Sequence, residues 1–359
     1  MPAIKKPNQH FDVLTWTGTG GGSGATRSIT GLNFQPDFIW EKARSSGSGH
    51  QLLDSVRGVG QNKVLASNSS GDEPEAPNTE SLYGWLSAIN SDGFTLTNGT
   101  STFDNWNKSA DTYVGWTWKG GGAAVANTAG SIASQVSANP TAGFSVVTYT
   151  GTGANATVGH GLGVAPEFII VKERTADRSW NVYAKALGTT KFFLLEQTTE
   201  AQTDSTKWNS TDANTSVFSV GSAVGTNNST GSFVAYCWAP IAGYSAFGSY
   251  KGNGSTTNDG PFVYLGFRPK FILGRRTDST GGSWMFDTSR NTSNLADDYF
   301  YANSPDGEFT NITTLNIDIL SNGFKVRSGT SPSAYINASG GTYIYMAFAE
   351  SPFKFSNAR

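Results

Sequence analysis

The side chains best suited to chemistry in this 359-residue chain are few and widely spaced. Its three histidines, His10, His50 and His160, are too few for a metal cluster, and no His-Glu-x-x-His, Cys-x-x-Cys or Gly-x-Ser-x-Gly pattern occurs. His160 stands in a Gly-His-Gly-Leu-Gly run, which favours a hydrogen-bonding turn residue over a metal ligand. The lone Cys237 lies in an apolar run, so we expect a buried small hydrophobe. These residues predict no catalytic, cofactor-binding or metal site.

The acidic residues offer two further kinds of chemistry. Asp54 and Arg57 are echoed by Asp287 and Arg290, whereas the middle of the chain has Tyr-Ala-Lys-Ala at that place. We interpret each Asp-x-x-Arg as a local ion pair bracing a turn, worth under about 1 kcal/mol if exposed; a catalytic acid is the alternative. A glycosidase needs two carboxylates facing each other across a cleft, and no acid pair recurs along the chain.

An acidic loop at 69–80 carries Asp72, Glu73, Glu75 and Glu80. Clustered acids can bind calcium, but the spacing fits no calcium-binding loop. We therefore expect a solvated loop.

Aromatic rings offer the last kind of chemistry, because a ring can stack on the apolar face of a sugar. Four tryptophans near Asn, Ser and Thr are candidates for stacking on a glycan: Trp85, Trp106, Trp208 and Trp284. Packing in the core or between domains is the alternative for each of them.

The elements that would position these residues are repeated three times. An aromatic residue is followed by glycines at alternate positions, which is typical of a strand that ends in a turn. Each copy leads into a proline and a charged residue before Phe-Ile, which predicts the start of a buried strand. An aromatic run closes each copy. The repeated markers are Trp16, Gly18, Gly20 and Pro36; Tyr149, Gly151, Gly153 and Pro166; and Tyr250, Gly252, Gly254 and Pro269.

The spacing of the copies sets the domain organisation. Trp16, Tyr149 and Tyr250 lie 149 − 16 = 133 and 250 − 149 = 101 residues apart, which is the length of a domain. We predict an all-β protein of three tandem homologous β-sandwich domains, of jelly-roll or lectin-like form. The predicted parts are an N-terminal arm at 1–10, repeats at 11–119, 143–240 and 241–359, and a Gly/Ala/Ser linker at 120–142. A short extended piece at 131–136 of this linker is expected along a sheet edge.

Composition limits the partners. The net charge of −2 argues against nucleic-acid binding, which needs a basic face. The start of the chain has no apolar core typical of a signal peptide, and no apolar run is long enough for a membrane helix. We expect a protein made in the cytoplasm that neither binds nucleic acid nor inserts into a membrane.

The repeated runs resemble a known module. Several runs are similar to a repeat of virion structural proteins of tailed, often marine, bacteriophages: Gly143–Gly153 with Val158–Pro166, Phe34–Trp40, Tyr113–Lys119, Gly243–Tyr250 and Gly341–Glu350. Such modules are frequently described as tail-fibre-like, and some resemble lectin-type sandwiches. The resemblance covers the chain from Phe11 onward. No long repetitive shaft or separate tail-docking domain accompanies it here.

The resemblance implies a non-enzymatic virion protein, either associated with the tail or fibre or accessory to the capsid as a decoration protein. Its expected partners are other capsid or tail proteins, and we expect a homo-oligomer within the particle. The repeated positions hold no cofactor-binding or reactive group, so we interpret the repeated residues as structural. A host-recognition module that binds a surface glycan is the alternative, and a polysaccharide depolymerase ranks third.

Overall fold

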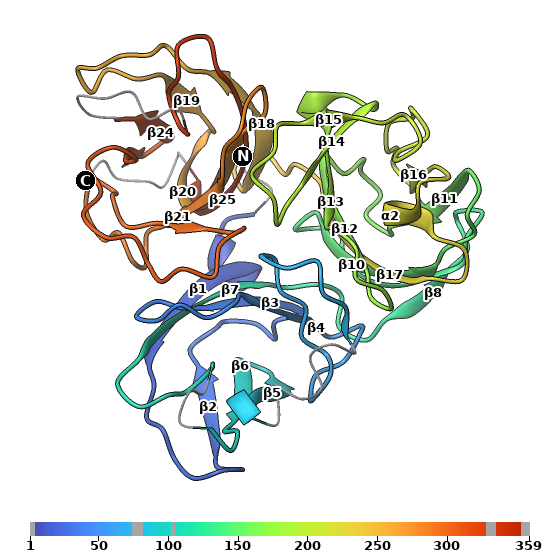
Figure 1. Ribbon diagram of the computed structural model, residues 1–359, viewed down its shortest axis with the longest axis horizontal. Coiled ribbons are helices and arrows are strands. Elements are labelled where there is room, and N and C mark those ends of the chain that lie inside the picture. The colour runs from blue at the N-terminus through green and yellow to red at the C-terminus, as the bar shows by residue number, and fades with distance from the viewer. Residues whose placement is uncertain (1–3, 74–81, 102–104, 328–334, 353–359) are drawn as a thin grey trace.

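A computed structural model describes residues 4–73, 82–101, 105–327 and 335–352. The protein is almost entirely built of antiparallel β-sheets, as the sequence predicted. We group its strands into three units by the sheets they form (Figure 1).

The described residues of unit one form seven strands. They are β1 (Phe11–Thr17), β2 (Thr26–Thr30), β3 (Phe38–Ala43), β4 (Gln51–Asp54), β5 (Trp85–Asn90), β6 (Gly93–Thr97) and β7 (Thr112–Trp118). A 3-10 turn, η1 (Pro7–Gln9), precedes them.

Unit two has ten strands and two short helical turns, η3 (Lys185–Leu187) and α2 (Val224–Asn227). The strands are β8 (Val125–Asn127), β9 (Ser134–Asn139), β10 (Phe144–Thr150), β11 (Ala156–Gly159), β12 (Phe168–Glu173), β13 (Asn181–Ala184), β14 (Lys191–Leu194), β15 (Gln202–Thr203), β16 (Val217–Val220) and β17 (Ser232–Trp238).

Unit three completes the chain. Its strands are β18 (Ser245–Lys251), β19 (Phe262–Tyr264), β20 (Phe267–Arg276), β21 (Ser283–Asp287), β22 (Phe300–Tyr301), β23 (Ile317–Leu320), β24 (Gly323–Val326) and β25 (Thr342–Pro352).

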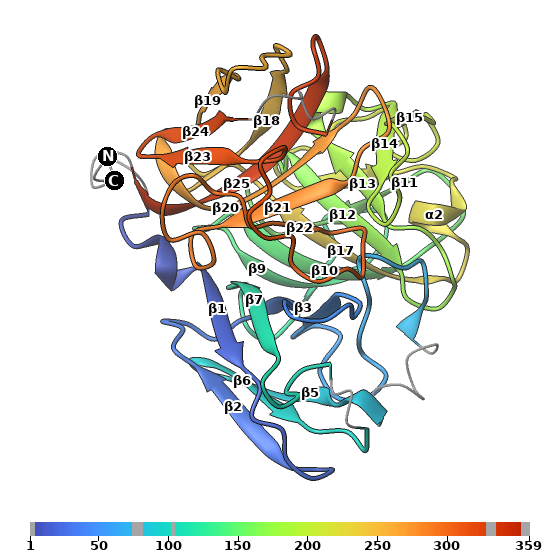
Figure 2. The same cartoon turned by 60° about the vertical axis from the view of Figure 1, so that its left-hand side comes forward.

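The strand order of the large sheet repeats from unit to unit. It is β1-β7-β3-β4 in unit one, β10-β17-β12-β13 within an eight-stranded sheet in unit two, and β18-β25-β20-β21 in unit three. A smaller sheet pairs equivalent strands in each unit, β2 with β6, β11 with β16 and β19 with β24. In unit one the small sheet lies on the outer side of the large one (Figure 2). This repetition agrees with a triplicated module, and the division into three tandem domains stays a prediction.

The register makes positions in the three units comparable. Phe38 pairs with Trp118, Phe168 with Trp238 and Phe271 with Phe348. These six residues are buried and belong to one hydrophobic cluster that draws on all three units. Because side chains alternate between the two faces of a strand, one face of each large sheet supplies this shared core and the other supplies the interior of its own unit.

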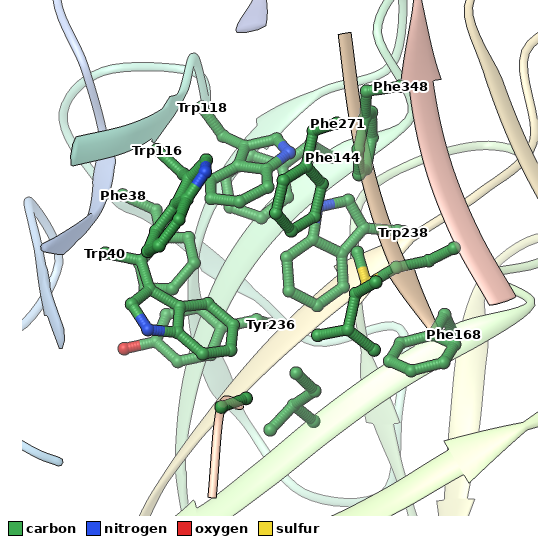
Figure 3. Packing of buried hydrophobic residues seen from close by; sticks show 14 of the residues in the cluster. Phe38, Trp40, Trp116, Trp118, Phe144, Phe168, Tyr236, Trp238, Phe271 and Phe348 are labelled. Carbon is green, nitrogen blue, oxygen red and sulfur yellow. The ribbon is translucent and has the colours of Figure 1, made fainter. Parts of the chain in front are cut away.

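The shared core is an assembly of aromatic rings (Figure 3). The rings of Phe38 and Tyr236 stack across the boundary of units one and two, with centroids 4.1 Å apart. Trp118 of unit one contacts Trp238 of unit two at 5.9 Å and Phe348 of unit three at 5.6 Å. The units are therefore packed around a common centre, as Figure 1 shows.

Two predicted segments outside the repeats are also packed. Within 120–142, β9 pairs with β10 and β8 pairs with β9, so this predicted linker extends the large sheet of unit two. In the predicted arm, Ile4 is buried in the shared core. The turn η1 contacts β1 of unit one and β25 of unit three.

Candidate functional site

The repeated glycines shape a turn in which the chain passes close to a second loop. A Cβ atom placed on Gly18, Gly151 or Gly252 would lie 1.9–2.2 Å from a backbone oxygen of that loop. Gly20, Gly153 and Gly254 have φ values of 65°, 73° and 66°, in the left-handed region that favours glycine. These markers thus have a steric reason in each unit.

An asparagine that the sequence analysis missed holds this turn in each unit. The side-chain oxygen of Asn107 accepts a hydrogen bond from Thr19 N at 3.0 Å, and its backbone oxygen accepts one from Gly20 N at 2.8 Å. Asn227 and Asn337 make the equivalent pairs of bonds. The three asparagines are spaced by 120 and 110 residues, and this recurrence is a signal that could have revealed them.

The aromatic markers pack inside the units. Trp16, Tyr149 and Tyr250 stack on Tyr113, Phe233 and Tyr343, with centroids 4.9–5.5 Å apart and ring planes within 12°. Their polar tips donate to the backbone oxygens at 106, 226 and 336, directly before the asparagines. The proline markers precede β3 and β12, whereas Pro269 lies within β20 at an irregularity of its pairing with β25.

The Asp-x-x-Arg pairs do brace turns, but they are completely buried and lie between units. Arg57 Nε donates to Asp54 Oδ2 at 2.5 Å, and a second guanidinium nitrogen donates to Glu73 at 2.8 Å. The hydroxyl of Tyr236, in unit two, donates to the same Asp54 oxygen at 2.8 Å. The first polar cluster consists of Asp54, Arg57, Glu73, Arg174 and Tyr236.

Glu73 connects the two units of this cluster. Its carboxylate accepts hydrogen bonds from Arg174 of unit two at 3.0 and 2.9 Å, and from Arg57 of its own unit. Burial alone would raise the pKa of Glu73, but the bonds from Arg174 and Arg57 outweigh it and lower this pKa. The expectation of a solvated loop is therefore wrong for Glu73, because an arginine 101 residues away neutralises its charge. Glu75 and Glu80 lie outside the described residues.

A second polar cluster repeats the same geometry between units three and one. Arg290 Nε donates to Asp287 Oδ2 at 2.6 Å, and the indole nitrogen of Trp116 donates to the same oxygen at 3.0 Å. Glu308 accepts from Arg290 at 2.7 Å and from Arg44 of unit one at 2.9 Å. The second polar cluster consists of Asp287, Arg290, Glu308, Arg44 and Trp116.

The boundary between units two and three lacks these charges at every equivalent position. By the strand register, Ala184 stands where Asp54 and Asp287 do, and Met346 stands where Tyr236 and Trp116 do. A backbone hydrogen bond identifies two further equivalent positions. Ala201 N donates to Thr277 O, as Glu73 N donates to Arg174 O, so Ala201 corresponds to Glu73 and Thr277 to Arg174. The uncharged counterpart consists of Ala184, Leu187, Ala201, Thr277 and Met346.

Three of the four tryptophans named as candidates for glycan stacking follow the alternative of packing in the core. Trp106, Trp208 and Trp284 are buried, so a sugar in solvent cannot reach their faces. Trp208 packs edge-on against Tyr183, and Trp284 packs against Phe286. Trp85 begins β5 and is partly buried.

His50, His160 and Cys237 are buried. His160 is buried, its Nε2 lies 2.9 Å from Asn214 O, and its Nδ1 accepts from Leu162 N at 3.2 Å, as expected of a turn residue. His50 is buried and accepts a hydrogen bond from Trp40, and desolvation lowers its pKa to about 3. Cys237 is buried as predicted, and desolvation raises the pKa of its thiol.

A polar pocket of about 430 Å³ lies beside the boundary of units one and two. Arg178 and Lys207 contribute positive charge to its wall, and Asp177 is the one acidic residue among the described residues of its lining. These described residues offer hydrogen bonds but do not include the two carboxylates that glycoside hydrolysis requires. Among the described residues no group of three or more His, Cys, Asp or Glu is arranged to hold a metal ion.

These features define an all-β scaffold of three repeated two-sheet units packed around one core. The chain belongs to the family described as a domain of unknown function, DUF7483, whose model matches residues 6–352. The match spans all three units, so the family model describes the three units together and not a single repeat. No curated protein matches the chain in sequence. In the part of the chain that is described, no helix has the length and apolar character needed to cross a membrane.

Proposed function

We propose that the chain is a non-enzymatic structural component of a tailed-bacteriophage particle, associated with the tail or fibre or accessory to the capsid. Support comes first from the resemblance of its repeats to virion modules. The observation that carries the proposal is the use of its charged side chains. Asp54, Arg57, Asp287 and Arg290 are buried between units, where they pair with one another and are not open to a substrate.

Because these charged groups are buried between units, the protein is rigid and presents the same surface in every copy. The units share one core and two buried polar clusters, so a movement of one unit against another would expose charges that have lost their partners. Such rigidity suits a component that packs against other virion proteins and against further copies of itself. Turns rich in Ser, Thr and Asn would supply hydrogen bonds to those neighbours.

The test is the protein content of the particle. Particles of the phage that encodes the chain would be purified by density gradient and analysed by mass spectrometry, with a replication protein of the same genome as the non-structural control. We expect the chain at a defined copy number and the control near background. Gold-labelled antibody would then show whether the chain lies on the capsid or the tail. A chain that is depleted from particles as strongly as the control is not a virion component.

Recognition of a host glycan is the second candidate function. A specific feature favours it: two aromatic side chains of unit three are exposed on the outer sheet. Of the tryptophans first considered for this role, Trp106, Trp208 and Trp284 are buried and cannot take part.

A further inference from the structure

The outer face of β19 in unit three carries two exposed aromatic rings. Phe262 is 46% exposed and Tyr264 is 64% exposed, while Val263 between them is buried. Since side chains alternate along a strand, both rings lie on the same face of the sheet. The strand is at the edge of the sheet β19-β24-β23. Neither ring has a hydrogen bond or a ring contact with any described residue.

Comparison of the units shows that these rings are not part of the repeated architecture. Val263 pairs with Phe324 as Ile29 pairs with Phe94 in unit one. The positions of Phe262 and Tyr264 therefore correspond to Ser28 and Thr30. In unit two, where Val158 pairs with Phe218, they correspond to Thr157 and Gly159. The fold is thus built twice without aromatic rings at these places, so packing does not require them.

The surroundings of the rings are suited to a polar ligand with apolar faces. Phe262 leans over Gly323, because a Cβ atom on that glycine would lie 3.2 Å from the ring. Gly323 is also the residue opposite Tyr264, so no side chain separates the two rings across the strand pair. Opposite Phe262 is Lys325, which forms an ion pair of 2.6 Å with the exposed carboxylate of Asp259.

We infer that Phe262 and Tyr264 form a saccharide-binding site, on which the rings stack against sugar faces while Asp259 and Lys325 bond to hydroxyl groups. A protein partner fits less well, because a stable interface covers about 800 Å² on each partner and is centred on a fully desolvated core. Here two rings adjoin the exposed polar stretch 256–259. The inference concerns the purified protein and does not depend on its place in a particle.

The experiment uses the full chain on an array of bacterial surface oligosaccharides, comprising lipopolysaccharide cores, O-antigen fragments and capsule fragments. The test variant F262S/Y264T installs the residues of unit one at the equivalent positions. The control V125S removes another exposed apolar side chain, from β8 of unit two. Thermal unfolding and circular dichroism would verify that both variants fold as the parent does.

We expect the parent and V125S to bind the same saccharide and F262S/Y264T to bind it about tenfold more weakly or not at all. Binding by all three proteins with equal affinity overturns the site, as does a parent that binds nothing on the array. Sedimentation velocity adds a further outcome. If the parent self-associates and F262S/Y264T does not, the rings form a contact between copies and the inference is wrong. Absence from purified particles would reject the proposed function without touching this result.

Discussion

Removing one charge from the first polar cluster should lower the free energy of unfolding more than replacing the whole cluster does. In the variant R57L, Asp54 and Glu73 keep their charges in the buried boundary between units one and two, and Tyr236 loses one of its bonding partners. The five-fold variant D54A/R57L/E73A/R174T/Y236M instead installs the residues that the chain itself uses between units two and three. The two variants share the loss of Arg57 and differ in what remains buried.

The magnitudes follow from burial. Asp54 and Arg57 have fully buried side chains, and breaking such a pair by removing one partner costs about 3–5 kcal/mol. Replacing a complete buried ionic group by apolar residues is often neutral or stabilising. The smaller side chains of the five-fold variant leave some empty volume, which is destabilising by about 24 cal/mol per Å³. We therefore expect R57L to be less stable than the five-fold variant by about 2 kcal/mol or more.

Urea unfolding followed by tryptophan fluorescence measures both free energies of unfolding, because tryptophans of all three units are buried. The parallel pair R290L and D287A/R290L/E308A/R44T/W116M repeats the comparison at the second polar cluster. The reasoning would be refuted if the loss of unfolding free energy rose in proportion to the number of substitutions. The five-fold variant would then be clearly less stable than R57L. Such a result would mean that the charges contribute independently.

Three further predictions concern other parts of the scaffold. G18A should destabilise the protein by about 2–4 kcal/mol because its Cβ would meet Lys108 O, whereas G22A, with open space around it, should be nearly neutral; chemical denaturation compares them. His50 has a pKa lowered to about 3, so below about pH 6.5 the unfolded chain binds a proton that the folded protein does not. The free energy of unfolding should therefore fall as the pH falls from about 6.5 towards 3. In a series of melting curves, H50Q should show a weaker dependence on pH. Because all three units share one core, calorimetry should record one cooperative transition with equal van't Hoff and calorimetric enthalpies, and three separate transitions would contradict the shared core.

Local features of the fold could be predicted from the sequence. Ser91-Asp92 connects β5 to β6 and Ser321-Asn322 connects β23 to β24. Each pair is followed by a glycine, and Asp-Gly and Asn-Gly are strong local signals of a hairpin turn. The burial of Cys237 and the hydrogen-bonded turn at His160 were also predictable. These features depend on residues within a few positions of one another.

The contacts between units could not be predicted in the same way. Glu73 meets Arg174 across 101 residues, and Glu308 meets Arg44 across 264. No local pattern links such partners, and each acid on its own has the sequence context of a solvated loop. For the same reason the complete burial of the Asp54 carboxylate could not be predicted from the local sequence, which indicated only an ion pair with Arg57.

Two boundaries between units carry a polar cluster and the third does not, and this difference is possible because the three units belong to one chain. In a trimer of identical units, a substitution would appear at all three boundaries at once. A continuous chain allows one boundary to change alone, provided that both sides change together, because a single buried charge without its partner is strongly destabilising. Ala184, Leu187 and Ala201 of unit two face Thr277 and Met346 of unit three, and the charged set is missing from both sides. The all-or-none pattern of these five positions is what strong coupling within each cluster predicts, and it is the reason to expect R57L to be worse than the complete replacement.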